Sequence, residues 1–236
     1  MTHTPVQVPD TIEKVIQRMR TIDEQLDPRD GVACFNRMYM RVTELVGQHI
    51  VEGTFKDPQF LERMDIIFAG LYFKAVDAAT AKASPPAAWK PLLDARHNRT
   101  IWPLQFALAG MNAHINHDLA LAVNATCKER HTTPSTKPVH ADYLTVNDLL
   151  EQAEAEVRAE YEPALARLAT ADAEQLKHIL SSFSIARARD VTWGSAVTLW
   201  QQQSFEPSYT MTLTGIVTTV TAASMVLLTP VVPPPS

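Results

Sequence analysis

The stretch from Ile101 to Val123, which reads IWPLQFALAGMNAHINHDLALAV, constrains the fold more than any other part of the chain. Arranged as a helix, it has no fully polar face to turn toward water, so such a helix belongs at the centre of its domain. Pro103 falls in the first turn, where a helix tolerates a missing backbone N–H. The sequence therefore predicts a central buried helix over about residues 101–127.

Helical periodicity recurs through the rest of the chain. Apolar residues at helical spacing predict helices over these ranges: 10–26, 32–51, 57–83, 89–98, 146–168 and, as one or two helices, 170–203. Thr11 and Asp57 suit the N-caps of the first and third helix, and Gly53 suits the end of the second. Thr145 suits the N-cap of a helix that follows a polar connection of about fifteen residues.

These patterns predict the fold class and the domain organisation. No series of strands with regular turn signals is present, and the chain has only 7 glycines. We expect an all-α, single-domain bundle of about seven to eight helices around the central helix, formed by residues 10–229. Residues 1–9 are expected to form a flexible arm, and residues 230–236 a Pro-rich tail.

The C-terminal part of the chain carries no charge after Glu206. The segment TMTLTGIVTTVTAASMVLLT is about twenty residues long, enough for a membrane span, and its alternating start also allows a strand. Threonine is poor material for a face in hydrocarbon, and no Lys/Arg cluster flanks the segment. We expect a buried helix that closes the bundle, and no membrane association.

Composition excludes some classes of partner and compartment. A net charge of −5 without a basic run gives no electrostatic footprint for nucleic acid, so a small, largely apolar molecule is the expected partner. Cys34 and Cys127 form no C-x-x-C pattern, which indicates neither a zinc knuckle nor a disulfide framework. The N-terminus lacks a charged region followed by an apolar one, so a cytoplasmic location is expected.

The central helix also carries the candidate functional residues. His114 and Asp118 are spaced i, i+4 and share a face, and His117 lies within about 100° of both. Asn112 and Asn116 flank them. Because each buried polar group costs roughly 1–3 kcal/mol when unpaired, three ionisable groups on one apolar helix favour a function.

The pattern allows three interpretations. His114 and Asp118 have the spacing to bind one metal ion from a single helix, with further ligands from Glu44, Asp65, His49 or His97. A buried histidine oriented by a carboxylate can instead transfer protons near neutral pH. The same groups can also satisfy one another and hold the bundle in register without chemistry.

Five segments resemble an uncharacterised all-helical family of actinobacteria and other bacteria, known only as a domain of unknown function. They are RDGVACFNRMYMRVTE, FAGLYFKAVD, WPLQFALAGMNAHINHDLALAV, DYLTVNDLL and SIARARDVTWGSAVTLW, which together span nearly the whole chain except its ends. The resemblance implies a helical fold and a pocket around Gln105, Asn112, His114, Asn116, Asp118, Arg187, Arg189 and Trp193. It implies no particular activity.

One motif, His114-x-x-x-Asp118 on an inner helix, is similar to a motif of the zinc-dependent phospholipase C and P1 nuclease group, which is also all-helical. The chain departs from that group because it lacks the further His and His/Glu motifs downstream and a Trp at the N-terminus. That resemblance implies a metal-assisted hydrolase.

We expect an enzyme that uses His114, with Asp118 as its orienter and His117 beside them, for acid/base chemistry on a small, largely apolar substrate. The expected reaction is a cyclisation or isomerisation in specialised metabolism, because actinobacterial relatives are common there. The substrate is expected to contact Gln105, Asn112, Asn116, Glu44, Tyr72, Arg187, Arg189 and Trp193. No cofactor is expected, and a divalent metal, if bound, would use His114 and Asp118. The alternatives are the metal-assisted hydrolase and a non-catalytic binding or assembly module.

Overall fold

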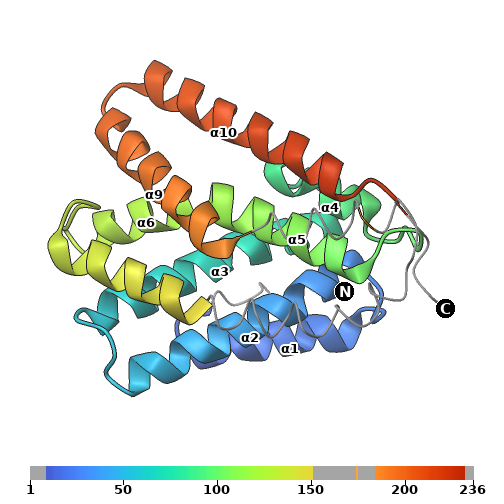
Figure 1. Cartoon of the computed structure of the whole chain (residues 1–236), viewed down its shortest axis with the longest axis horizontal. Coiled ribbons are helices and arrows are strands. Elements are labelled where there is room, and N and C mark those ends of the chain that lie inside the picture. The colour runs from blue at the N-terminus through green and yellow to red at the C-terminus, as the bar shows by residue number, and fades with distance from the viewer. Residues whose placement is uncertain (1–8, 151–173, 175–183, 232–236) are drawn as a thin grey trace.

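The central helix runs through the middle of the protein, as its apolar sequence predicted. The computed structural model describes residues 9–150, 174 and 184–231. The central helix consists of α5 (Pro103–Ala113), the π-helical turn η2 (His114–Asp118) and α6 (Leu119–Glu129). All residues of α5 after Pro103 are buried. Figure 1 shows α5 and α6 roughly in line, with other helices on both sides.

The first three helices are α1 (Ile12–Gln25), α2 (Gly31–Val51) and α3 (Pro58–Thr80). Helices α2 and α3 pack on the central helix, and α1 packs on α2 and α3. The predicted N-caps are confirmed, because Thr11 accepts a hydrogen bond from the backbone N–H of Lys14 and Asp57 accepts one from that of Phe60. Gly53 follows α2 with a φ of +74°, a conformation that favours glycine. In these regions the local sequence determines where the helices begin and end.

Helices α2 and α5 approach each other closely. A Cβ atom added to Gly110 of α5 would lie 2.4 Å from the ring of Phe35 on α2, and one added to Gly31 would lie 2.5 Å from the ring of Phe106. Each helix therefore supplies a glycine where the other supplies an aromatic ring. This pairing brings the aromatic side chains of α2 against the central helix.

The connection after α6 is shorter than predicted. Residues 137–150 are helical, so Thr145 lies inside a helix rather than at its N-cap, and its hydroxyl donates to the carbonyl of Ala141 at 3.1 Å. The prediction was wrong because Val139, Tyr143 and Val146 recur at helical spacing and are buried, which overrides the local capping signal. The predicted helix over 146–168 lies mostly outside the described residues.

Two helices cover the opposite side of the central helix. A short 3₁₀ turn, η1 (Ala87–Trp89), and α4 (Lys90–Ala95) precede α5 in the chain. Near the C-terminus, α9 (Ile185–Gln202) packs on α6, and α10 (Glu206–Leu227) packs on α5, η1 and α4. Figure 1 shows α9 and α10 as an outer layer beyond the central helix.

The C-terminal segment is a helix, but the prediction that it is a core helix was wrong. Of its residues only Val220 and Ser224 are buried, and 11% of its most apolar 18-residue window is inside the protein. One face of α10 packs on α5, and the other residues of the helix are partly or fully exposed. With a mean hydropathy of 1.5 over that window, it is the one described helix that is long and apolar enough to cross a bilayer.

The described residues contain helices and no strand, and their buried apolar side chains form one continuous core. The fold is all-α, with a single domain organised around the central helix. Most of the expected N-terminal arm and Pro-rich tail falls outside the described residues.

Candidate active site

The candidate site is built on the π-helical turn in the middle of the central helix. Such turns widen a helix locally and occur frequently at functional sites. The carbonyl of Ile115 in this turn accepts a hydrogen bond from the Thr192 hydroxyl of α9 at 3.1 Å, which ties the turn to its neighbour. His114 and Asp118 share one side of the turn, as predicted, and His114 Nδ1 lies 3.0 Å from Asp118 Oδ2.

Asp118 is a buried carboxylate with three hydrogen-bond partners. Besides His114, the indole Nε1 of Trp89 donates to Oδ2 at 2.9 Å, and Nδ1 of His117 lies 2.7 Å from Oδ1. Burial opposes ionisation of Asp118, but the hydrogen bonds from His114 and His117 outweigh it and hold the pKa of Asp118 below its usual value. Asp118 is therefore an ionised acceptor that fixes the surrounding rings.

His114 lies in an aromatic cage and is 1% exposed. Its ring stacks on Phe68 with centroids 3.5 Å apart and an interplanar angle of 5°, and the edge of Tyr39 is at 4.4 Å. Burial lowers the pKa of His114, although the hydrogen bond to Asp118 opposes this. The imidazole is thus neutral near pH 7.

The hydrogen bond to Asp118 also determines which nitrogen of His114 carries the proton. An ionised carboxylate only accepts, so Nδ1 is the protonated nitrogen and Nε2 keeps its lone pair. Nε2 is buried and has no hydrogen-bond partner. His114 therefore presents an unused basic nitrogen inside the protein.

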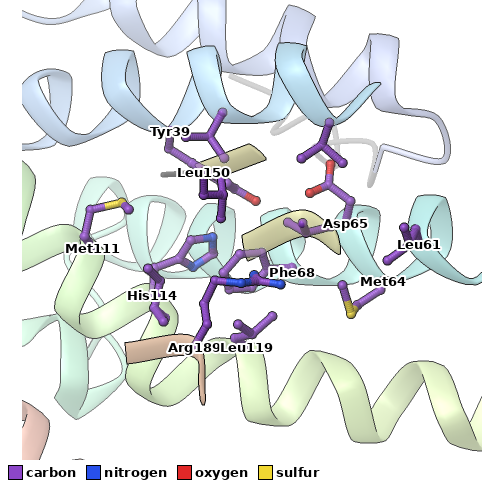
Figure 2. Close-up of a pocket in the computed structure, with 14 residues that line it drawn as sticks. Tyr39, Leu61, Met64, Asp65, Phe68, Met111, His114, Leu119, Leu150 and Arg189 are labelled. Carbon is purple, nitrogen blue, oxygen red and sulfur yellow. The ribbon is translucent and has the colours of Figure 1, made fainter. Parts of the chain in front are cut away.

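His114 lines a cavity of about 40 Å³ between α2, α3, the central helix, the helix over 137–150 and α9. Figure 2 shows its ring beside Phe68, with Asp65 and Arg189 among the lining side chains. The remaining walls are apolar except for the phenol of Tyr39: Val42, Val46, Leu61, Met64, Met111, Ile115, Leu119, Val146 and Leu150. By volume this space accommodates a few small atoms or water molecules.

Asp65, on α3, is the second titratable group of the cavity. Its Oδ2 is buried without a hydrogen-bond partner. Burial raises the pKa of Asp65 to about 7, and the charge of Arg189 opposes this shift only in part. A large fraction of Asp65 is therefore protonated at neutral pH, and in that form it can donate a proton.

Arg189 is a buried cation at the edge of the cavity, held in place from the helix over 137–150. Its Nε donates to the side-chain oxygen of Asn147 at 2.5 Å, and a terminal nitrogen donates to the carbonyl of Tyr143 at 3.2 Å. Its guanidinium also lies 4.1 Å from the centroid of the Tyr143 ring. This fixed positive charge favours negative charge that develops nearby.

The structure brings His114, His117 and Asp118 together, and among the predicted substrate contacts it places Arg189 in the cavity wall. Tyr72 is behind the cavity, where its ring packs 6.2 Å from that of His114 and its hydroxyl donates to Asn36. His117 bonds Asp118 but does not line the cavity.

The predicted amide contacts hold helices rather than line the cavity. Asn112 donates to the carbonyl of Val220 and to the hydroxyl of Ser224, both at 2.9 Å. Gln105 bonds the carbonyls at the end of α10, and Asn116 bonds Asn112. These side chains form hydrogen bonds with buried backbone groups, and no ligand is needed to explain why this apolar helix carries polar residues.

The three other predicted contacts also lie away from the cavity. Glu44 forms an ion pair with Arg20 at 2.9 Å on the surface. Arg187 is exposed, and Trp193 stacks on the exposed His140 with ring centroids 4.6 Å apart. In the second half of α2 and along α9 the buried residues recur three or four positions apart on one face, and these three side chains lie off that face.

Sequence reasoning considered Asp65 only as a metal ligand and did not assign Tyr39 to the site. The signal for Asp65 was an acidic residue inside the apolar stripe of α3, next to Met64 and one turn from Leu61 and Phe68. An ionisable group on a face that is otherwise apolar is expected to be buried, and a buried acid has a raised pKa.

A metal site has few free ligands here. Both oxygens of Asp118 and Nδ1 of His114 are already used in hydrogen bonds. Of these two residues, only Nε2 of His114 could still coordinate a metal ion. Across residues 9–150, 174 and 184–231, no three His, Cys, Asp or Glu side chains converge to hold an ion. His49 and His97, named as further ligands, bond Thr54 and Asp30 instead.

A family model described as "Family of unknown function (DUF5995)" matches residues 12–230 of the chain. The chain belongs to this family. The match confirms the resemblance to an uncharacterised domain and extends over nearly the whole chain. No curated protein and no solved structure matches the chain.

Proposed function

We propose that this DUF5995 protein is an enzyme that catalyses proton transfer in the cavity beside His114. The observation that carries the proposal is the pairing of Asp118 with His114 Nδ1, which leaves Nε2 as an unpartnered buried base on a side chain that lines the same cavity as Asp65. Unpaired polar groups are costly inside a protein, and function is a common reason for their retention.

His114 acts as the general base in this proposal. Nε2 accepts a proton from the substrate, and the ionised Asp118 stabilises the imidazolium that forms, as a carboxylate does in other oriented histidine pairs. The stacked ring of Phe68 and the bond to Asp118 fix the imidazole, so little reorganisation accompanies the transfer.

Asp65 acts as the general acid. With a pKa of about 7 it holds a proton at neutral pH, and it donates that proton to an oxygen of the substrate while His114 removes a proton from carbon. A β,γ-unsaturated ketone is thereby converted to its dienol. The His114 imidazolium then protonates the γ carbon while Asp65 takes back the hydroxyl proton, which moves the double bond to the α,β position and restores both groups. Attack of the enol carbon on a second electrophilic carbon would close a ring. Neither step requires an oxidant or a reductant.

The walls of the cavity indicate a small and largely apolar substrate. Nine lining residues are Val, Leu, Ile or Met, and the volume of about 40 Å³ accepts the reacting group of a substrate rather than a large ring system. Met64 and Met111 are flexible side chains that can yield to a larger ligand. We also propose that the protein acts in the specialised metabolism of a bacterium and is located in the cytoplasm.

The proposal is tested by proton exchange on simple ketones. The protein is incubated with acetone or cyclohexanone in D₂O, and loss of the α-hydrogens is followed by NMR. We expect exchange above the buffer rate, and its return to the buffer rate in His114→Gln, since a positioned base contributes about 10²–10⁴-fold.

The matched control is His140→Gln, which changes an exposed histidine outside the cavity and should leave exchange unchanged. Equal exchange by the wild-type protein and His114→Gln for both ketones would contradict acid/base catalysis and favour a binding or assembly module. Loss of exchange on treatment with a chelator would instead favour the metal-assisted alternative.

A further inference from the structure

The phenol of Tyr39 is a buried polar group that the proton transfer described above does not use. Tyr39 lies on α2, is 2% exposed and lines the cavity together with His114 and Asp65. Its hydroxyl is buried and has no hydrogen-bond partner within the protein. An unpaired buried hydroxyl is costly, and a phenylalanine ring would fill the same space without it. The Tyr39 hydroxyl is therefore available to a bound ligand.

The Tyr39 side chain lies close to both the base and the acid of the site. The edge of its ring meets that of His114, with centroids 4.4 Å apart and an interplanar angle of 69°. Figure 2 shows Tyr39 reaching from α2 toward the space between His114 and Asp65. These three side chains line one cavity, and each carries a buried polar atom without a partner: the Tyr39 hydroxyl, His114 Nε2 and Asp65 Oδ2.

Tyr39 and Asp65 can both donate a hydrogen bond at neutral pH. Burial raises the pKa of Tyr39 well above its usual value, and the nearby Asp65 adds to this shift, so the phenol keeps its proton. Asp65, with a pKa of about 7, is protonated in a large fraction of the molecules. A carbonyl oxygen has two lone pairs and accepts from two donors at once, whereas Nε2 of neutral His114 can only accept. The oxygen of a carbonyl compound therefore fits between Tyr39 and Asp65.

We propose that Tyr39 is a further catalytic residue, which binds with Asp65 the carbonyl oxygen of a neutral, unsaturated ketone or aldehyde while His114 removes a proton from carbon. This inference rests on the proton transfer proposed above and names the substrate class of the same site. The electron pair of the broken C–H bond forms the new C=C bond, and the C=O π pair takes the proton of Asp65. Tyr39 keeps its proton and donates a hydrogen bond that strengthens as negative charge develops on the oxygen. The rest of the substrate meets mostly apolar walls, so it carries no charge there.

Thr43 offers the alternative, in which the Tyr39 hydroxyl is only structural. It lies one turn further along α2, and its hydroxyl is also buried without a partner. A hydrogen bond between the two hydroxyls would stabilise the protein and would be lost in Tyr39→Phe. Tyr72 has such a structural role, because its hydroxyl donates to Asn36 at 3.1 Å.

Thermal unfolding separates the two roles. Tyr72→Phe should lower the midpoint temperature, because it leaves the side-chain oxygen of Asn36 without its donor. Tyr39→Phe should leave the midpoint unchanged or raise it, because its hydroxyl has no partner to lose. An equal decrease in both variants would assign Tyr39 a structural role and overturn the proposal.

Deuterium exchange of acetone in D₂O tests the catalytic role of Tyr39 in the full-length protein. Tyr39→Phe should slow the protein-catalysed exchange roughly tenfold or more, because one donor to a developing oxyanion contributes about 10²–10³-fold. Tyr209→Phe is the matched control, since Tyr209 lies on α10 outside the cavity, and it should leave exchange unchanged. Exchange that His114→Gln abolishes and Tyr39→Phe leaves unchanged would overturn the role of Tyr39 while the proposed base stands.

Acetone labelled with ¹³C at its carbonyl detects the oxygen contact without turnover. Strong hydrogen bonds move the carbonyl resonance downfield, whereas transfer from water into a cavity without donors moves it upfield. We expect a saturable downfield shift from the buffer value with the wild-type protein and with His114→Gln, and its loss in Tyr39→Phe. A resonance that is unchanged or moves upfield with the wild-type protein would overturn the oxygen contact, even where exchange shows that His114 is a base. A downfield shift without any exchange would contradict the proposed function and reduce Tyr39 to a binding residue.

Discussion

Asp118 determines the chemical state of the site because it accepts hydrogen bonds from three side chains at once. Trp89, His114 and His117 surround its two oxygens, and these bonds outweigh the effect of burial on its pKa. The ionised carboxylate then sets the tautomer of His114. A second acid, Asp65, lacks such donors and shows the opposite shift, with a pKa of about 7. Two carboxyl groups in one core therefore have different protonation states.

Asp65 should make the stability of the protein depend on pH. Its pKa is about 7 in the folded protein and about 3.9 when unfolded, so the folded state binds the proton more tightly. The contribution of this group to the free energy of unfolding is fully present below pH 4 and is lost as the pH rises toward 7. Asp65→Asn removes the loss, which is about 1.4 kcal/mol per pH unit between the two pKa values, so it should raise the free energy of unfolding by on the order of 3 kcal/mol more at pH 8 than at pH 5.

Urea denaturation of both proteins at the two pH values measures this effect. Asp94→Asn is the matched control, because Asp94 pairs with Lys90 at 2.6 Å on the surface and such pairs contribute little. A gain for Asp65→Asn that is equal at pH 5 and pH 8 would show that Asp65 is not protonated in the folded protein near neutral pH.

At the scale of elements, the contact between α2 and α5 positions the aromatic cage of His114. Phe35 of α2 lies against Gly110 of α5, and its ring is 5.7 Å from that of His114 and 5.2 Å from that of Trp89. A change in the distance between α2 and α5 would therefore move Phe35 and, through it, the ring of His114. The π-helical turn, held by Thr192 of α9, fixes the other side of the ring.

Gly110→Ala tests this contact. Its Cβ would lie 2.4 Å from the ring of Phe35, which has no free side to move to in a packed core, so we expect a loss of about 1–3 kcal/mol in the free energy of unfolding. The same change at Gly70 of α3, where a Cβ meets nothing within 4 Å, should instead stabilise by roughly 0.5–1 kcal/mol through helix propensity. Thermal or urea denaturation of the two variants measures both effects. Equal effects at the two positions would contradict the close approach of α2 and α5.

For the whole molecule, the architecture was predictable because its signals are local. The apolar stretch over 101–127 predicts the central helix, and the caps at Thr11 and Asp57 predict the starts of α1 and α3. The prediction that a helix begins at Thr145 was wrong because its capping pattern is local, while the burial of Tyr143 and Val146 depends on distant helices. The exposure of α10 had no local signal, since an apolar sequence does not reveal how much of a helix its neighbours cover.

The candidate site was predictable only within one helix. The spacing of His114 and Asp118 is a property of the helix itself, and their hydrogen bond follows from it. The contribution of Asp65 arises from the packing of α3 against the central helix, with Arg189 of α9 lining the same cavity, and no spacing along the chain encodes this arrangement. Gln105 and Asn112 look like site residues in the sequence because they are polar on an apolar helix, but they bond α10.

The most direct test of the account is the tautomer of His114 in the intact protein, because the free Nε2 depends on the hydrogen bond between Nδ1 and Asp118. Protein with ¹⁵N-labelled histidine is studied by NMR from pH 5 to 8, with assignment by His114→Gln. We predict a neutral ring with the proton on Nδ1 at pH 7 and a pKa below the ordinary 6.5, because burial outweighs the bond to Asp118. Asp118→Asn should shift the proton to Nε2. A proton on Nε2 in the wild-type protein, or a pKa at or above 6.5, would contradict the assignment of His114 as the free base.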